Sequence, residues 1–161
     1  GIMFNNNISI NTSIAISTKA REEIFQIADI NFDIFNLKIN LNKTKFINKK
    51  IGKVVIGNSN LFLKNDKLTL NTDVIIDINN VDNLFSLLQT KKVSRKLIKN
   101  ILINLDYDFH TNQIEFNNMK IDNKEVNDEL LVMLEGFNDN NLNNFNKSKR
   151  LLNLIFDAYE G

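Results

Sequence analysis

The stretch "NLDYDFHTNQIEFNNMKI", residues 104–121, alternates apolar and polar side chains on both sides of a short polar turn. One face carries the apolar residues Leu105, Tyr107, Phe109, Ile114 and Phe116. Alternation with a period of two is typical of a strand that buries one face. The stretch therefore predicts a β-hairpin, and the function of the chain depends on what covers the apolar face of that hairpin.

A second stretch has the same pattern, with four turn residues "KNDK" between two apolar pairs. These pairs are Leu61 with Leu63 and Leu68 with Leu70. Both stretches predict hairpins with loops longer than the minimal two residues. The match fits either an ancestral duplication or an ordinary antiparallel meander, and stacked hairpins are the simplest architecture for both.

Two further strands are expected near the N-terminus. "ISINTSIAIS", residues 8–17, alternates isoleucine with small or polar residues. In "IADINFDIFNLKINLN", residues 27–42, the apolar phase jumps by one residue between Ile34 and Phe35. Because a slip of one residue inverts every later side chain, we expect a β-bulge there, or a long strand that passes from one packing environment to another. A long strand that bends belongs to a curved sheet.

Helical spacing appears in three segments, near residues 81–99, 124–136 and 141–159. The first predicts two short helices broken near Thr90, with Asn80 and Asp82 as candidate N-caps. In the second, Glu125 is expected in the first turn and Gly136 suits the end of the helix. The predicted fold is α+β: a curved antiparallel sheet of stacked hairpins, with a U-shaped groove as one form of it, and amphipathic helices toward the C-terminus.

The chain has 161 residues, no cysteine and a formal net charge of +1. A chain of this length can bury a core without disulfides, and the lack of cysteine excludes a thiolate nucleophile. No apolar stretch approaches the roughly 18–20 residues that cross a bilayer. We therefore expect a soluble, β-rich single domain over residues 1–161 that is a fragment of a longer protein.

The sequence gives little indication of a catalytic site. The one histidine, His110, lies in a polar turn without partners that converge on it. Asp106, Asp108 and Glu115 alternate with the apolar face, so they are expected on a polar outer face together with Asp73 and Asp77. The sequence therefore predicts a protein that is not an enzyme and that uses no cofactor and no metal.

One local cluster of basic residues comprises Lys91, Lys92, Arg95, Lys96 and Lys99. A smaller second group comprises Lys147, Lys149 and Arg150. The first cluster fits a solvated helix face, or a site that meets lipid headgroups or a partner. A nucleic-acid partner is disfavoured, because few aromatic residues are interleaved with the basic ones.

The order "NNVDNLFSLLQTKKVSRKLIKNILINLDYDFHTNQIEFNNMKIDN", residues 79–123, resembles the C-terminal region of bacterial AsmA-like envelope proteins. In that region an Asp-containing helix segment precedes paired alternating strands that end in a short hydrophobic-x-hydrophobic-Asp unit. The resemblance covers about residues 30–123. It implies a periplasmic segment of a parent protein that is anchored in the inner membrane, takes part in outer-membrane biogenesis and carries lipid along an apolar groove.

Two functions are consistent with these observations. The first is a non-catalytic module that binds or transfers phospholipid or another envelope lipid along one sheet face, with envelope proteins as further partners. The residues expected to line that face are Ile30, Phe32, Leu68, Leu70, Val74, Ile76, Ile103, Leu105, Tyr107 and Phe109. The second is a structural or protein-interaction domain whose own helices cover the face completely.

Overall fold

The computed structural model describes residues 8–15, 24–35, 38–137 and 145–161. Within these residues, nine strands form one antiparallel sheet in the order β1-β2-β4-β5-β6-β7-β8-β9, and β3 also pairs with β2. The strands are β1 (Ile8–Ala15), β2 (Ile27–Phe35), β3 (Lys38–Asn40), β4 (Lys45–Asn48), β5 (Gly52–Lys64), β6 (Lys67–Ile78), β7 (Asn100–Asp108), β8 (Gln113–Ile121) and β9 (Lys124–Glu125). The sheet is open, and neighbours in the chain are mostly neighbours in the sheet, so the predicted antiparallel stack of hairpins is confirmed.

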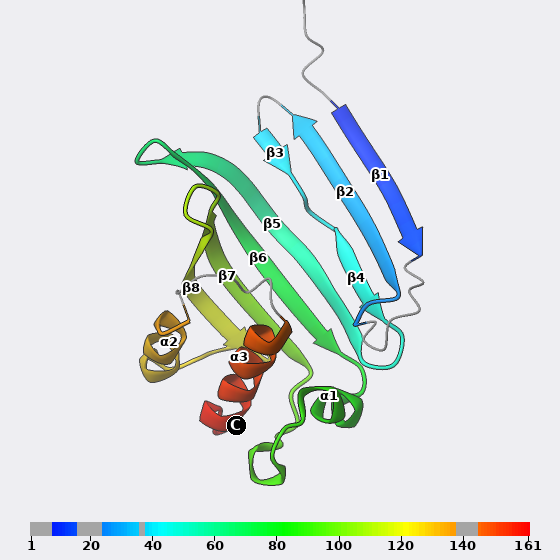
Figure 1. Cartoon of the computed structure of the whole chain (residues 1–161), viewed down its shortest axis with the longest axis vertical. Helices are drawn as coiled ribbons and strands as arrows, with labels where there is room; N and C mark the ends of the chain where they lie inside the picture. Colours follow the sequence, from blue (N-terminus) through cyan, green and yellow to red (C-terminus); the bar gives the residue numbers. More distant parts are fainter. Residues whose placement is uncertain (1–7, 16–23, 36–37, 138–144) are drawn as a thin grey trace, which may run out of the picture.

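In the described part of the chain, three α-helices and one 3-10 turn accompany the sheet: α1 (Val81–Leu88), η1 (Lys92–Ser94), α2 (Asp128–Glu135) and α3 (Phe145–Ala158). Figure 1 shows α3 across one face of the sheet, α2 beside β8, and α1 at the end of β6. This arrangement confirms the predicted α+β class with helices toward the C-terminus.

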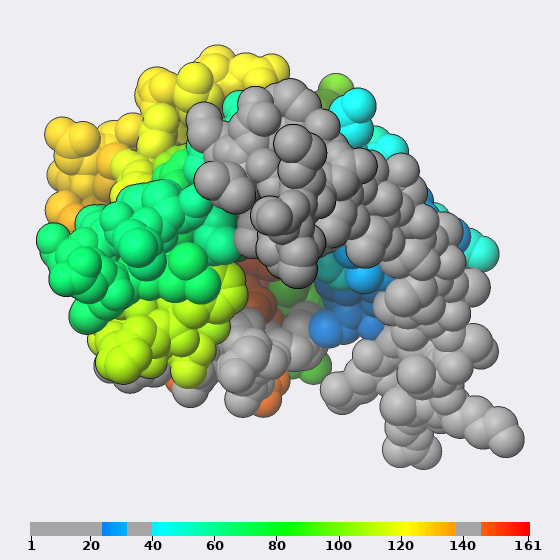
Figure 2. Space-filling model, turned by 90° about the horizontal axis from the view of Figure 1, so that it is seen from above, coloured from blue at the N-terminus to red at the C-terminus, as the bar shows by residue number. Residues whose placement is uncertain are grey.

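The two predicted hairpins form, but one turn is shorter than expected. Asn65 and Asp66 alone connect β5 to β6, and both have positive φ, 51° and 62°. Two left-handed residues in a two-residue loop match the twist of the flanking strands, and Asn and Asp tolerate that backbone. The loop between β7 and β8 keeps four residues, 109–112. Figures 1 and 2 show these two turns side by side at one end of the sheet.

The bulge or long bent strand expected at Ile34 and Phe35 is wrong. The chain reverses after Phe35, and β3 pairs back on β2 with Ile34 opposite Ile39. A hairpin with a short turn shifts the apolar phase by one residue, as a bulge does, so the pattern alone did not separate the two.

Bulges occur instead in β5 and β8. Gly57 and Asn58 lie opposite the single residue Asp73, and Asn117 is an extra residue in β8 opposite β7. A Cβ on Gly57 would lie 3.0 Å from the Cβ of Asp73, so the residue type suits this close approach. Because a bulge bends a strand and increases its twist, the long β5–β6 hairpin curves along its length (Figure 1).

Helix boundaries differ from prediction at two places. Asn80 caps α1 as expected, with its side chain accepting a hydrogen bond from the Asn83 backbone N–H, but the second short helix is reduced to η1. The second predicted helix begins later, at Asp128, because Asn127 is its N-cap, and Glu125 lies in β9. Gly136 follows the last turn of α2 as predicted.

The core lies between β6–β8 and the helices. Its fully buried large side chains are Leu88, Ile98, Ile101, Met119, Ile121, Leu134, Ile155 and Phe156. The rings of Phe85 and Phe156 meet edge to face with centroids 5.1 Å apart, which joins α1 to α3. The helices therefore cover part of the apolar sheet face with their own side chains.

Candidate functional site

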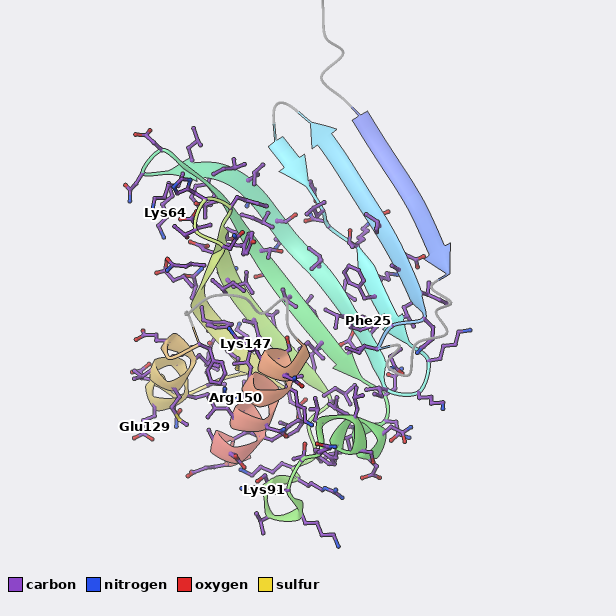
Figure 3. The ribbon with its side chains drawn as sticks, viewed as in Figure 1. Phe25, Lys64, Lys91, Glu129, Lys147 and Arg150 are labelled. Atoms are coloured by element: carbon purple, nitrogen blue, oxygen red, sulfur yellow. The ribbon has the colours of Figure 1, made fainter. Side chains whose placement is uncertain are left out.

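An apolar cavity of about 510 Å³ lies between the sheet and the helices α1 and α3. The sheet contributes the side chains of Val54, Val74, Ile76, Ile78, Ile103, Leu105 and Phe116. The helices contribute Leu84, Leu87, Leu88, Leu151 and Leu152, and the segments before β2 and β5 add Ile24, Phe25 and Ile51. Figure 3 labels Phe25 near the β4 side of the sheet and Arg150 on α3, which lie on the two sides of this region.

The register between neighbouring strands determines which side chains form the floor of the cavity. Val54 of β5 pairs with Ile76 of β6, and Val74 pairs with Ile103 of β7. Because side chains alternate between faces, residues 74, 76 and 78 of β6 all point toward the helices. The period-two pattern of the sequence is therefore the direct cause of the apolar floor.

The helical wall is fixed by hydrogen bonds. The buried Thr90 hydroxyl donates to Asn153 Oδ1 at 2.6 Å, and Asn153 Nδ2 donates to the Leu88 carbonyl at 2.9 Å. These two bonds connect the end of α1 to the middle of α3. They hold both helices at a fixed separation above the sheet.

Polar groups around the cavity already have partners. Asn48 Nδ2 donates to the Ile24 carbonyl at 2.6 Å, and Asn48 Oδ1 accepts from the backbone N–H groups of Lys50 and Ile51. Lys53 and Asp77 form an ion pair of 3.9 Å. The site therefore favours a hydrocarbon over a polar ligand.

The same sheet face continues beyond the helices as an apolar strip, which comprises Leu61, Leu63, Leu68, Leu70, Tyr107 and Phe109. Leu63 is 69% exposed, Leu68 42% and Phe109 47%. The rings of Tyr107 and Phe109 meet edge to face with centroids 4.9 Å apart, and the Tyr107 hydroxyl donates to Asn112 Oδ1 at 2.8 Å. The apolar face is thus covered over one part and open over the other.

The predicted face residues divide among three locations. Val74, Ile76, Ile103 and Leu105 line the cavity, whereas Leu68, Leu70, Tyr107 and Phe109 belong to the strip. Ile30 lies half-buried in β2, outside the cavity lining. Phe32 is in β2, but its side chain lies outside the described residues.

Sequence reasoning missed most of the cavity wall. The helix residues, such as Leu84 and Leu151, were visible as amphipathic stripes, but nothing in the pattern showed which strands they face. Ile24 and Phe25 precede a strand and carry no periodic signal. Their place at the cavity follows from tertiary structure alone.

The outer sheet face carries the predicted carboxylates in a hydrogen-bonded network. Asp106 Oδ1 accepts from Asn71 Nδ2 at 2.7 Å and from Asn117 Nδ2 at 3.0 Å, and Asp106 Oδ2 accepts from Lys64 at 3.3 Å. Burial acts to raise the pKa of Asp106, but these hydrogen bonds outweigh it and lower that pKa. Hydrogen bonds to Glu115 and Asp106 raise the pKa of Lys64.

His110 lies exposed in the β7–β8 loop, where its backbone N–H donates to Asp108 Oδ1 at 2.7 Å. Among the residues that the structure describes, no group of three or more His, Asp or Glu side chains converges as a metal site would. In the same described part, no helix has the length and apolar character needed to cross a membrane.

The basic cluster lies apart from the cavity. Lys91, Lys92, Arg95, Lys96 and Lys99 occupy the segment between α1 and β7, and none of them lines the cavity. Figure 3 shows Lys91 at the end of the molecule opposite Lys64. Of the second group, Lys149 donates to the Gln89 side chain, so α3 also contacts the start of this segment.

Models of known protein families, curated protein sequences and solved structures were compared with the chain, and none of them matches it. The AsmA-like resemblance therefore stays a prediction from the order of patterns in residues 79–123.

Proposed function

We propose that the chain is a non-catalytic lipid-binding domain that holds an acyl chain in the cavity between the sheet and the helices α1 and α3. The observation that carries this proposal is the cavity itself, about 510 Å³ with an almost entirely aliphatic and aromatic lining. Ligand pockets commonly enclose roughly 300–1,000 Å³. Because the polar groups at its edge are already paired, hydrocarbon is the ligand that loses least on entry.

The energetics support an acyl chain as ligand. Each methylene removed from water contributes about 0.8 kcal/mol, so about ten methylenes would contribute on the order of 8 kcal/mol before the cost of ordering the chain. The apolar strip continues the cavity floor along β6 and β7, through Leu70 and Tyr107. It would serve as the path along which an acyl chain enters or leaves.

The cellular setting of the proposal rests on the AsmA-like resemblance alone. On that basis the domain belongs to a periplasmic protein anchored in the inner membrane, and the lipid is a phospholipid or another lipid of the bacterial envelope. Transfer toward the outer membrane, with other envelope proteins as partners, would be its role in outer-membrane biogenesis.

A second candidate function is a structural or protein-interaction domain with a self-covered core. The observation that favours it is the complete burial of Ile155 and Phe156 of α3 against the sheet. In that case the cavity would be a packing defect without a ligand, and the strip would be covered by another protein.

Two tryptophan variants separate these functions. Val54→Trp would fill the cavity from its floor, whereas Val55→Trp places the same side chain on the opposite sheet face, since adjacent strand residues alternate. Titration with a fluorescent fatty acid should show binding to the wild type and to Val55→Trp, and at least tenfold weaker binding to Val54→Trp, about 1.4 kcal/mol. Native mass spectrometry of the purified protein should show copurified lipid.

The result that would overturn lipid binding is equal affinity of Val54→Trp and Val55→Trp, or no fatty acid binding by the folded wild type. Circular dichroism and urea unfolding of both variants establish that each is folded. A hydrophobic dye bound by the wild type and displaced by phospholipid would add support for an open face.

A further inference from the structure

We propose that the segment between α1 and β7, residues 89–99, is a docking loop that attaches the protein to an anionic lipid surface, with Val93 and Leu97 entering the interface. The inference deepens the proposed function, and rests on it in that docking would hold the lipid-binding domain at a membrane, with the strip directed away from that membrane. The docking loop is separate from the cavity, because none of its residues lines the cavity.

The docking loop exposes two aliphatic side chains. Val93 is 90% exposed and Leu97 is 70% exposed, the two highest values among the large apolar side chains that the structure describes. Singly exposed apolar side chains are ordinary, so the case for an interface depends on the buried anchors and the charges that accompany this pair.

This exposure is imposed by the anchors of the docking loop. Thr90, Ser94 and Ile98 are 4%, 6% and 0% exposed, so the loop is held to the core at every fourth residue. Val93 and Leu97 immediately precede two of these anchors and point outward. Because the anchors are buried, the apolar pair cannot turn inward without unpacking the loop.

Backbone and side-chain bonds keep the docking loop in this form. The Ser94 N–H donates to the Lys91 carbonyl at 3.0 Å, and Arg95 Nε donates to the Thr90 carbonyl at 3.2 Å. The Arg95 guanidinium also lies 5.6 Å from the centre of the Phe85 ring. A preorganised loop loses little conformational entropy on docking.

The charges around the apolar pair define the chemistry of the surface that it fits. Five cations surround it: Lys91, Lys92, Arg95, Lys96 and Lys99. No acidic residue occurs between Asn83 and Leu105. In the part of the chain that the structure describes, the ion pairs involve Lys53, Lys64, Lys67 and Lys120 and none of the five.

Two acidic residues hydrogen-bond to the docking loop, and within the described residues neither forms an ion pair with the five cations. Asp122 accepts the backbone N–H groups of Lys99 and Asn100. Asp157 contributes only its backbone carbonyl, which accepts from Lys96 Nζ at 3.4 Å. Cations around protruding aliphatic tips match an anionic bilayer, in which phosphates meet the lysines and the tips enter the headgroup boundary. Nucleic acid would favour stacking aromatics over Val and Leu.

The test is cosedimentation of the full chain with two kinds of vesicle. One is phosphatidylcholine alone and the other is an equal mixture of phosphatidylcholine and phosphatidylglycerol. We expect binding to the mixed vesicles only, and weaker binding as salt rises. Lys91→Gln with Lys92→Gln should weaken the partition about thirtyfold, and Val93→Ser with Leu97→Ser by at least about tenfold.

Matched controls carry the same changes on other exposed surfaces. Lys49→Gln with Lys50→Gln removes two exposed charges at the β4–β5 turn, and Val132→Ser removes an apolar side chain that is 63% exposed on α2. Each control should bind within about twofold of the wild type. Equal binding to both kinds of vesicle, no effect of the Val93 and Leu97 changes, or binding to duplex DNA in place of vesicles would each overturn the proposal.

The fatty acid titration distinguishes this proposal from the proposed function. Loss of vesicle binding with fatty acid affinity unchanged is expected of the docking-loop variants. Val54→Trp should weaken fatty acid binding and leave vesicle binding unchanged. A docking loop that fails this test while the wild type still binds fatty acid would leave the cavity assignment standing.

Discussion

At the scale of single residues, Asp106 shows how one carboxylate organises a sheet face. Its side chain is 13% exposed and receives hydrogen bonds from Asn71, Asn117 and Lys64, which outweigh the effect of burial on its pKa. A carboxyl group whose pKa is lowered by folding stabilises the folded state when it is ionised. That contribution is present above its ordinary value of 3.8 and is lost as pH falls through the lowered pKa.

Asp106→Asn should therefore make the stability of the folded state less dependent on pH in the acidic range. We expect the urea midpoint of the wild type to fall on acidification between about pH 5 and pH 2, and the midpoint of the variant to fall less over the same range. Asp108, whose pKa is also lowered, should preserve part of the dependence in the variant. Asp66→Asn, in an exposed turn, is the control. Identical pH profiles of wild type and Asp106→Asn would contradict the assigned role.

Asp66 itself offers a second prediction at this scale. It has a φ of 62° in the two-residue β5–β6 turn, and glycine accepts this backbone without the cost that a side chain brings. Asp66→Gly should raise the free energy of unfolding by up to about 1 kcal/mol. His110→Gly, at an exposed position in the β7–β8 loop that is not among those with positive φ, should lower it. Thermal unfolding followed by circular dichroism measures both.

At the scale of elements, the contact between α1 and α3 controls the cavity wall. The Thr90 hydroxyl is buried and has Asn153 as its side-chain partner, while Asn153 also caps the carbonyl of Leu88. A buried hydroxyl without a partner is costly, so the pair acts as one unit.

Asn153→Ala should lower the free energy of unfolding by about 1–3 kcal/mol, because it leaves the Thr90 hydroxyl unpaired in the core. Addition of Thr90→Val should recover part of the loss, since the unpaired hydroxyl is then removed. Asp157→Ala, exposed on the same helix, should change stability by less than about 0.5 kcal/mol. Additive effects of Asn153→Ala and Thr90→Val in urea unfolding would show that the bond contributes little.

Some elements of the fold could be predicted from the sequence, and others could not. Alternation in residues 61–70 and 105–116 identified two hairpins and their apolar face, because period and burial are coupled within one strand. The β2–β3 reversal was misread, because a tight turn and a bulge invert the apolar phase alike. The cavity wall was not predicted, because an amphipathic stripe such as that of α3 shows that a helix packs but does not show against which strands.

At the scale of the whole molecule, the apolar sheet face is covered unevenly. Helices cover the end that holds Ile76 and Ile103, whereas Leu63 and Phe109 lie exposed at the other end. A cavity that continues into an open strip suits entry and exit of a ligand from one side. The proposed docking loop lies at the opposite end from the β5–β6 turn (Figure 3).

The position of the strip predicts that its residues control the rates of fatty acid entry and release and have little effect on the equilibrium affinity. Leu68→Ser with Phe109→Ser should slow fatty acid entry and release while leaving the equilibrium affinity within about threefold, because neither residue lines the cavity. Stopped-flow fluorescence measures the rates, and titration measures the affinity. Phe62→Ser, on the outer face, is the control for a change in exposed apolar area. A large loss of affinity, with release much faster than in the wild type, would place the ligand on the strip and not in the cavity.

The amide and carboxylate side chains on the outer face have one more consequence, for how the strands are aligned. A slip of two residues between β6 and β7 would keep every apolar side chain on its proper face, so hydrophobic pattern alone cannot forbid it. Asn104 Nδ2 donates to Asp73 Oδ1 at 2.7 Å, and Asn100 Nδ2 donates to Asp77 Oδ1 at 2.6 Å. A two-residue slip would separate both pairs. These polar contacts therefore favour the observed register over a shifted one that the apolar face alone would allow.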